Sequence, residues 1–152
     1  MTDRQIISNS PDETFELGAA LGKELRGGEV ILLTGGLGAG KTLLTKGILS
    51  SLNFDVDEVT SPSFTLVNLY KTERFNIYHI DLWRSGNGDA AFSVGLEEIL
   101  EDEKAIVIIE WAERLGNFAF HSSVYLIDLA GDGEEPRQIL IRRREKTPAS
   151  TV

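Results

Sequence analysis

The chain has 152 residues, 41% hydrophobic and 26% charged, values typical of a globular protein with one core. Asp and Glu outnumber Lys and Arg by 24 to 15, and the net charge of −9 argues against a stand-alone nucleic-acid binder. With no cysteine, disulfides, thiolate zinc sites and cysteine nucleophiles are excluded. No apolar run approaches the roughly 18 residues of a membrane span and no apolar signal region follows the N-terminus, so we expect a cytoplasmic protein without membrane attachment.

A first helix is predicted to begin after Ser10. This residue can act as N-cap, Pro11 suits the first helical position, and Glu13 completes a capping box. Three leucines then share one helical face at four-residue spacing: Leu17, Leu21 and Leu25. The pair Gly27-Gly28 is expected to end the helix.

Two later segments, residues 29–34 and 105–109, are apolar without polar alternation, as in strands buried on both faces of a parallel sheet. The other predicted elements are a helix over 41–52, a hairpin of strands 64–70 and 75–82, an acidic helix over 96–103, and a strand pair 124–129 and 138–143. We expect one domain over residues 1–145 and a disordered tail over 146–152.

The loop between the first buried strand and the second helix matches the phosphate-binding pattern G-x-x-x-x-G-K-[ST] over residues 35–42. Its glycines let successive backbone N–H groups face a phosphate, Lys41 reaches the β- and γ-phosphates, and the Thr42 hydroxyl binds Mg²⁺. A glycine-rich turn that binds nothing has a similar composition, but the flanking strand and helix favour the phosphate site. The predicted fold is a P-loop NTPase-like α/β sandwich with a mixed, mostly parallel central sheet and an antiparallel C-terminal strand pair.

Two acids end apolar strands. A P-loop protein needs a carboxylate at such a position for its metal, and Glu110, after residues 105–109, is the best candidate. An ordinary exposed carboxylate at a strand end is the alternative. Asp81, after residues 75–80, can share the metal or polarise the attacking water.

Three residues beside these acids have open roles. Arg84 can stabilise charge in the transition state or pair with Asp81, and the sequence favours neither. His79 is better interpreted as a packed, hydrogen-bonded histidine than as a catalyst. Trp111 fits both a core position and an aromatic side chain that faces a partner.

Ser61, Ser63 and Thr65 follow the helix after the glycine-rich loop, where P-loop proteins place a segment that senses the γ-phosphate. A capped turn is the alternative. No N-K-x-D tetrapeptide for guanine occurs, which favours ATP over GTP. A small-metabolite kinase remains a rival, although the loop over residues 85–90 lacks the arginines of a kinase lid.

Four blocks occur in one order: residues 35–42, 61–67, 78–84 and 108–111. With its S-P-[ST]-[FY]-T-L-V, H-x-D-x-[YW]-R and E-W patterns, this set resembles the TsaE family (formerly YjeE), bacterial P-loop ATPases of tRNA threonylcarbamoyladenosine biosynthesis. The resemblance extends over nearly the whole chain. It implies ATP and Mg²⁺ as cofactors, and slow ATP hydrolysis that depends on partners, the TsaB–TsaD synthase pair. It does not imply a direct, strong grip on tRNA.

The resemblance also implies roles for individual positions. The cofactor-binding set is Gly35, Gly38, Ala39, Gly40, Lys41, Thr42 and Leu43. Thr42 and Glu110 would serve Mg²⁺, Asp81 falls at a position important for activity, and Ser61, Ser63 and Thr65 resemble a switch segment. With the residues considered above, the candidates for hydrolysis are Lys41, Asp81, Glu110 and Arg84. Trp111 falls at a position important for activity, and the turn over residues 131–133, with Gly133, is expected near the nucleotide base.

The chain departs from the family pattern G-D-L-G-A-G-K-T-T at two loop positions, where Gly36 replaces Asp and Leu43 replaces the second Thr. Trp83 stands where Tyr is usual. Loss of the loop carboxylate puts the turnover rate in question, whereas binding through backbone N–H groups should survive. Three functions follow as hypotheses: a partner-activated ATPase, a small-metabolite kinase and a non-catalytic nucleotide sensor.

Overall fold

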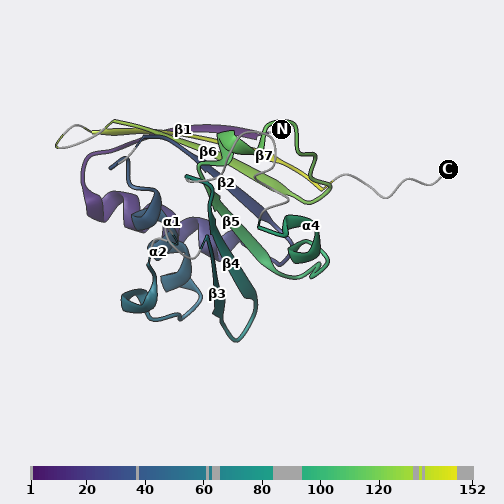
Figure 1. Cartoon of the computed structure of the whole chain (residues 1–152). Helices are drawn as coiled ribbons and strands as arrows, with labels where there is room; N and C mark the ends of the chain where they lie inside the picture. Colours follow the sequence, from purple (N-terminus) through teal and green to yellow (C-terminus); the bar gives the residue numbers. More distant parts are fainter. Residues whose placement is uncertain are drawn as a thin grey trace.

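The structure, a computed structural model, describes residues 2–36, 38–60, 62, 66–83, 94–131, 134 and 136–146. A seven-stranded sheet runs through it in the order β1-β7-β6-β2-β5-β4-β3 (Figure 1). The elements, with η for a short 3-10 helix, are β1 (Thr2–Ser8), α1 (Pro11–Glu24), β2 (Val30–Thr34), α2 (Lys41–Ser51), η1 (Val56–Glu58), β3 (Val67–Lys71), β4 (Asn76–Asp81), α4 (Leu96–Ile99), β5 (Ile106–Glu110), η2 (Ala112–Leu115), β6 (Val124–Ala130) and β7 (Arg137–Arg144).

The centre of the sheet is parallel and its two sides are antiparallel. Strands β6, β2, β5 and β4 run in one direction. Strand β3 is antiparallel to β4, and β7 is antiparallel to β6. This arrangement confirms the predicted mixed sheet and its antiparallel C-terminal pair. Because the carboxyl ends of parallel strands meet at one edge, the segments that follow β2, β4 and β5 come together there.

Strand β1 is an element that the sequence analysis did not predict. It pairs antiparallel with β7 along its whole length and forms one edge of the sheet. Apolar and polar residues do not alternate in its sequence, because two isoleucines are adjacent. Ile6 packs on the core, while Ile7 is 60% exposed. A short edge strand with polar residues on its open face leaves little periodicity to detect.

The core has two layers, one on each face of the sheet. Helices α1 and α2 cover one face, where Ile31 and Leu33 of β2 point, and α4 covers the other, where Val30 and Leu32 point. Both sets of side chains are buried. The absence of polar alternation in β2 and β5 therefore reflects burial on both faces, as predicted.

Helix α1 begins as predicted, with one difference in its cap. The Glu13 N–H donates to the Ser10 hydroxyl at 3.1 Å. The Glu13 carboxylate, however, accepts from the N–H of Asn9, the residue before the N-cap, and not from that of Ser10 itself. The reciprocal cap of the helix is thus shifted by one residue.

Helices α1 and α2 pack backbone to backbone through two glycines. A Cβ at Gly47 would lie 2.1 Å from the Phe15 carbonyl oxygen, and one at Gly18 would lie 2.2 Å from that of Leu44. Neither position has room for any side chain. This contact holds α2, and with it the loop that precedes α2, at the edge where β2 ends.

Two predicted boundaries differ from the structure. Helix α4 ends at Ile99, whereas the sequence predicted a helix to residue 103. The acids at 97, 98, 101, 102 and 103 repel one another along such a helix and offer nothing to pack on the sheet. Of the predicted tail, Lys146 is described and donates from its N–H to the Ser123 hydroxyl at 3.0 Å. Residues 147–152 and the predicted loop 85–90 lie outside the described residues.

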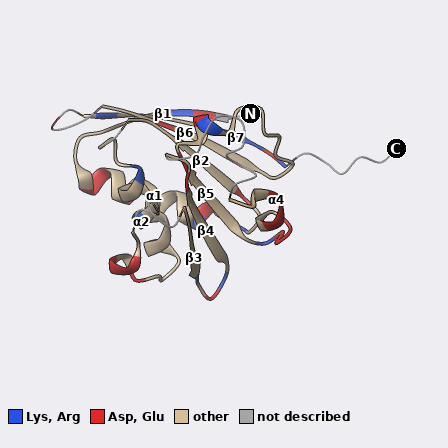
Figure 2. Ribbon diagram, viewed as in Figure 1, with Lys and Arg blue, Asp and Glu red and all other residues tan. Residues whose placement is uncertain are grey.

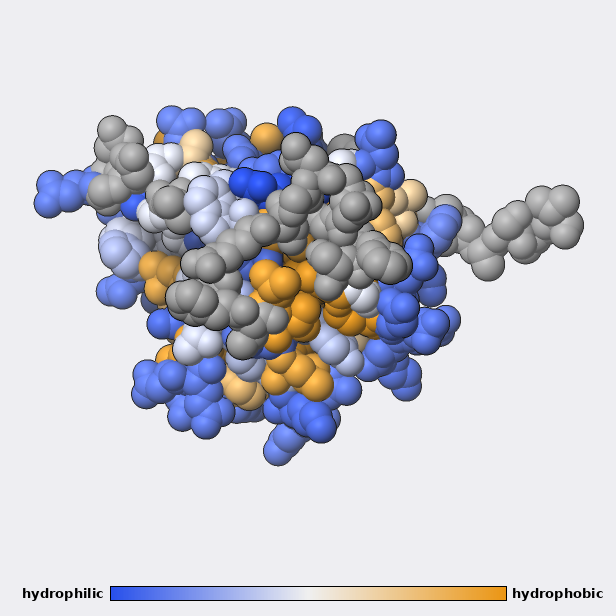
Figure 3. Space-filling view, in the orientation of Figure 1, coloured by the Kyte–Doolittle hydropathy of each residue, from blue (hydrophilic) through white to orange (hydrophobic). Residues whose placement is uncertain are grey.

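In the ribbon of Figure 2 the positions of acidic and basic residues are scattered over the helices, strands and turns, and the basic positions do not gather on one element. Figure 3 shows apolar residues gathered at the middle of the face in view and hydrophilic residues around its rim. The large apolar side chains exposed among the described residues are Ile7, Leu69, Trp83 and Leu126. None of the helices in the described part of the chain is long and apolar enough to cross a membrane.

Candidate functional site

The loop between β2 and α2 has the backbone that its glycines predict. Gly35, Gly38 and Gly40 adopt positive φ angles of 138°, 76° and 105°, which side chains other than glycine rarely accept. Gly40 is the N-cap of α2 and supplies no side-chain hydrogen bond. The first N–H groups of α2 are therefore available to an anion at the positive end of the helix. Within the loop, the side chain of Ala39 is buried, and Leu37 lies outside the described residues.

Lys41 is buried within this loop. Its ammonium donates to the carbonyl oxygens of Gly35, at 2.5 Å, and Gly36, at 2.9 Å, and lies 4.1 Å from the centre of the Trp111 ring. Only 6% of the residue is exposed. Burial lowers the pKa of Lys41, while the negative charges of Glu110, Glu113 and Asp81 act in the opposite direction. The negative charges that act on this cation thus come from β4, β5 and η2.

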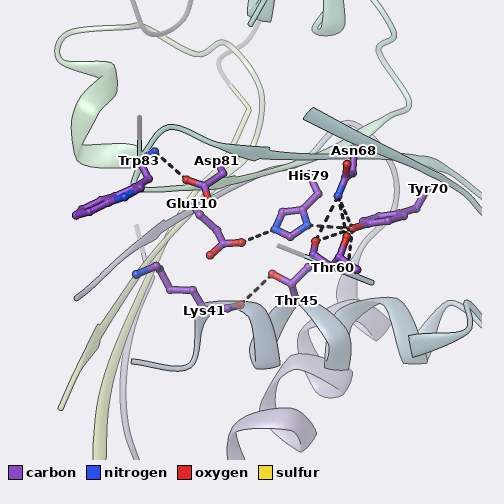
Figure 4. Close-up of polar contacts among 9 residues, drawn as sticks. All are labelled: Lys41, Thr45, Thr60, Asn68, Tyr70, His79, Asp81, Trp83 and Glu110. Atoms are coloured by element: carbon purple, nitrogen blue, oxygen red, sulfur yellow. Dashed lines mark hydrogen bonds and ion pairs between the residues drawn. The ribbon is translucent and has the colours of Figure 1, made fainter. Parts of the chain in front are cut away.

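Asp81 and Glu110 are direct neighbours across the parallel pair β4 and β5. Each is 3% exposed. The Asp81 Oδ1 atom accepts from the Trp83 N–H at 2.8 Å, and the Glu110 Oε2 atom lies 2.5 Å from His79 Nε2 (Figure 4). Two buried carboxylates beside a buried ammonium form the polar centre of this edge.

These side chains suit a magnesium ion held together with a nucleotide. Thr42 is half-buried in the first turn of α2 and carries a hydroxyl, which like the carboxylates of Glu110 and Asp81 is an oxygen ligand of the kind that Mg²⁺ prefers. Among the described residues, no group of three or more His, Cys, Asp or Glu converges as a metal cage. Mg²⁺ commonly uses one or two carboxylates together with phosphate oxygens. The donor set therefore fits this ion when phosphates complete its shell.

Trp111 connects the acids to the loop. It follows Glu110 and has a left-handed φ of 58°, an uncommon conformation for a bulky residue. The turn places its ring over Lys41 and beside Trp83, with ring centres 4.4 Å apart. Its position between core and surface accounts for the two interpretations that the sequence left open.

His79 is the packed, hydrogen-bonded histidine that the sequence favoured. It is fully buried, and its second ring nitrogen, Nδ1, lies 3.3 Å from the Tyr70 hydroxyl. Leu43 is half-buried next to Thr42. The remaining predicted positions lie outside the described residues: Ser61, Ser63, Thr65, Arg84 and Gly133.

Two residues at this site were missed by sequence reasoning. The Arg137 guanidinium, at the start of β7, donates to the carbonyl oxygens of Ala39 at 3.2 Å and Gly38 at 3.0 Å. Asp128 of β6 accepts from the Thr34 hydroxyl at 2.7 Å, just before the loop. Neither residue belongs to a motif, so only the sheet order could have revealed them.

A separate open cavity of about 900 Å³ lies at the other end of the parallel strands, where β2 and β5 begin. Its walls include Gly28, Glu29, Ala105, Arg74 and Glu103. None of the predicted site residues lines it. Its acidic and basic walls are mixed, so we place the chemistry at the glycine-rich loop.

Comparisons with known proteins agree with this arrangement. The family model described as "Threonylcarbamoyl adenosine biosynthesis protein TsaE" matches residues 8–139. A Nostoc sp. protein named tRNA threonylcarbamoyladenosine biosynthesis protein TsaE is 39% identical over 147 residues, covering 95% of this chain and 85% of its own. The Rickettsia felis protein of the same name is 36% identical over 108 residues, covering 71% of this chain and 62% of its own, so the match spans less than two thirds of that relative.

Among solved structures, the crystal structure of Bacillus subtilus YdiB aligns with a TM-score of 0.72 at 25% sequence identity. The alignment covers 92% of this chain and 84% of that one. The likeness supports the P-loop NTPase-like fold. On the family match, the identity to curated relatives and the shared fold, this chain belongs to the TsaE family.

Proposed function

We propose that this chain binds ATP with Mg²⁺ at the loop over residues 35–42 and hydrolyses it, in the service of tRNA threonylcarbamoyladenosine biosynthesis. The observation that carries the proposal is the meeting of Lys41 with the buried carboxylates of Asp81 and Glu110 at the end of the loop. The absence of an N-K-x-D tetrapeptide supports ATP over GTP.

Each side chain has a role that follows from its position. When a nucleotide binds, Lys41 exchanges its hydrogen bonds to two loop carbonyl oxygens for hydrogen bonds to phosphate oxygens. The negative phosphate oxygens keep the Lys41 ammonium charged in a site that holds little water. Thr42 and Glu110 would hold Mg²⁺, which would supply positive charge next to the phosphates. Asp81, fixed by the Trp83 N–H, faces Glu110 and orients the attacking water.

Five further assignments follow the family pattern. Ser61, Ser63 and Thr65 are proposed to sense the γ-phosphate, Arg84 to act on transition-state charge, and Gly133 to lie near the base. Thr60 directly precedes Ser61, and Trp83 directly precedes Arg84. Both Thr60 and Trp83 lie near the site in Figure 4. We also propose a cytoplasmic location.

The partners proposed are the TsaB and TsaD proteins, with the tRNA held by them. Family membership supports this pairing. The net charge of −9 supports it as well, because an acidic protein gains little from direct contact with a phosphate backbone. The chain would then meet its partners through protein surfaces.

The test is a measurement of ATP hydrolysis by the chain alone and with the TsaB–TsaD pair. We expect slow turnover alone and a clear stimulation by the pair. Lys41→Ala should abolish binding or turnover, and Glu110→Ala should remove the Mg²⁺-dependent turnover while some binding remains. Absence of stimulation would overturn the partner-activated ATPase. A phosphorylated product from a metabolite mixture, in place of ADP and phosphate, would indicate a small-metabolite kinase.

A non-catalytic nucleotide sensor is the alternative that one observation favours. Gly36 stands where the family pattern has Asp, so the loop lacks a carboxylate near the phosphates. A Cβ at Gly36 would meet no atom within 4 Å, so Gly36→Asp can be introduced without a steric clash. Tight binding with single-turnover hydrolysis at the background rate would support the sensor. Faster hydrolysis by Gly36→Asp than by the native chain would show that the missing carboxylate limits turnover.

A further inference from the structure

A buried chain of hydrogen bonds leads from Glu110 away from the glycine-rich loop. His79 Nε2 lies 2.5 Å from Glu110 Oε2, and His79 Nδ1 lies 3.3 Å from the Tyr70 hydroxyl oxygen. That oxygen lies 3.1 Å from the Thr60 carbonyl oxygen (Figure 4). His79 is 0% exposed, Glu110 3% and Tyr70 6%, so water does not compete for these contacts.

The contact with Glu110, and not the contact with Tyr70, determines which ring nitrogen of His79 must carry hydrogen. The Thr60 N–H and the Asn68 side-chain amide both approach the Tyr70 oxygen at 3.3 Å and can only donate to it. The Thr60 carbonyl oxygen, 3.1 Å from the Tyr70 oxygen, can only accept the single Tyr70 proton, so the contacts of Tyr70 do not assign the ring hydrogens of His79. A carboxylate oxygen accepts, so the Nε2 hydrogen of His79 donates to the Glu110 Oε2 atom.

We propose that His79 is a positioning residue for Glu110, and that Tyr70 restrains the ring of His79 from its other side. The inference rests on the proposed function, in which Glu110 serves Mg²⁺. A carboxylate on the last residue of a strand has several rotamers, and a donor fixed to one of its oxygens leaves the other directed toward the loop. Outer hydrogen bonds of this kind orient metal ligands in proteins.

Packing alone does not account for this arrangement. A histidine that only filled the core would be satisfied by backbone groups, whereas both ring nitrogens of His79 face side chains. Those side chains come from different strands, β3 and β5, on either side of β4. Tyr70 is itself fixed by Asn68 and Thr60, so the ring of His79 is restrained from both sides.

The test uses two substitutions of His79, each of which places a side-chain amide at the position of one ring nitrogen. The terminal amide of His79→Gln reaches the position of Nε2 and can donate to Glu110. The shorter amide of His79→Asn reaches only the position of Nδ1 and leaves Glu110 without its donor. Calorimetry of nucleotide binding, with Mg²⁺ and with EDTA, gives the gain in affinity due to the metal for each protein.

We expect His79→Asn to lose about 10–100-fold of the metal-dependent gain, the range typical of outer-shell substitutions, and to bind as the native chain does in EDTA. His79→Gln should recover most of that loss, and Tyr70→Phe should show a smaller loss than His79→Asn. Thermal unfolding monitored by circular dichroism identifies any variant that fails to fold. If His79→Asn does not fold, the comparison of His79→Gln with the native chain takes its place.

The outcomes separate the two proposals. If the native chain gains no affinity from Mg²⁺, the proposed function fails. If the native chain gains affinity and folded His79→Asn gains equally, the positioning role is overturned. A loss of the same size in His79→Gln and His79→Asn would also overturn it, because packing and not the Nε2 hydrogen bond would then be responsible.

Discussion

The ammonium of Lys41 lies 4.1 Å from the centre of the Trp111 ring and bonds to two carbonyl oxygens of its own loop. Both residues flank the place where a triphosphate would lie, one from α2 and one from the turn after β5. Attraction between a cation and an aromatic face is worth about 0.5–2 kcal/mol. A nucleotide that draws Lys41 toward its phosphates must therefore change the surroundings of Trp111.

The first prediction concerns intrinsic fluorescence. The chain has two tryptophans, Trp83 and Trp111, with ring centres 4.4 Å apart. We expect ATP and Mg²⁺ to change the tryptophan emission, because the cation beside Trp111 moves. The change should persist in Trp83→Phe and vanish in Trp111→Phe, with calorimetry confirming that both variants are saturated. A change that vanishes only in Trp83→Phe would contradict the arrangement.

The second prediction separates binding from stability at Lys41. Burial lowers its pKa below that in the unfolded chain, so the charged form opposes folding below the folded-state pKa and the penalty is relieved as pH rises above it. At neutral pH, Lys41→Met should abolish nucleotide binding and leave the melting temperature equal or higher. Lys46→Met, half-buried in the same helix, should preserve binding. A clear drop in melting temperature for Lys41→Met would mean that its bonds to Gly35 and Gly36 outweigh the burial of its charge.

The third prediction concerns the packing of α1 on α2. Gly47→Ala places a Cβ 2.1 Å from the Phe15 carbonyl oxygen, and such overpacking typically costs about 1–3 kcal/mol. Its helix propensity improves by about 1 kcal/mol, which offsets only part of the loss. Denaturant titration should therefore show a lower free energy of unfolding. Gly36→Ala, with no atom within 4 Å of its Cβ, is the matched control and should change stability by less than about 0.5 kcal/mol.

The fourth prediction follows from Tyr125. This residue is 1% exposed and donates to Glu24 at 3.2 Å. Burial chiefly raises its pKa to about 12, and Glu24 adds to the effect while Arg143 opposes it. Because the unfolded pKa is near 10, the stabilisation is complete below pH 10 and is lost as pH approaches 12; a shift of this size corresponds to roughly 2–3 kcal/mol.

Denaturant titrations from pH 8 to 11.5 should thus show the native chain losing stability relative to Tyr125→Phe, which cannot ionise there. At pH 8 the variant should be less stable by about 1 kcal/mol, the usual worth of one hydrogen bond. Two curves that stay parallel across this range would contradict the raised pKa.

The sequence predicted most elements because their signals are local. The cap at Ser10, the apolar runs that became β2 and β5, and the hairpin of β3 and β4 each depend on neighbouring residues. It failed at β1, whose edge position gives weak alternation. It also extended α4 too far, because the acids that follow Leu100 repel one another along a helix and offer nothing to pack on the sheet.

By itself, the sequence determined the glycine-rich loop, the acids at the strand ends and the family, because a motif is a fixed spacing along one chain. Only the tertiary structure decided which distant residues support them. Glu110 meets His79 from 31 residues away, and Arg137 reaches Gly38 from 99 residues away. Such contacts depend on strand order and register, which bring side chains together only after the sheet has formed.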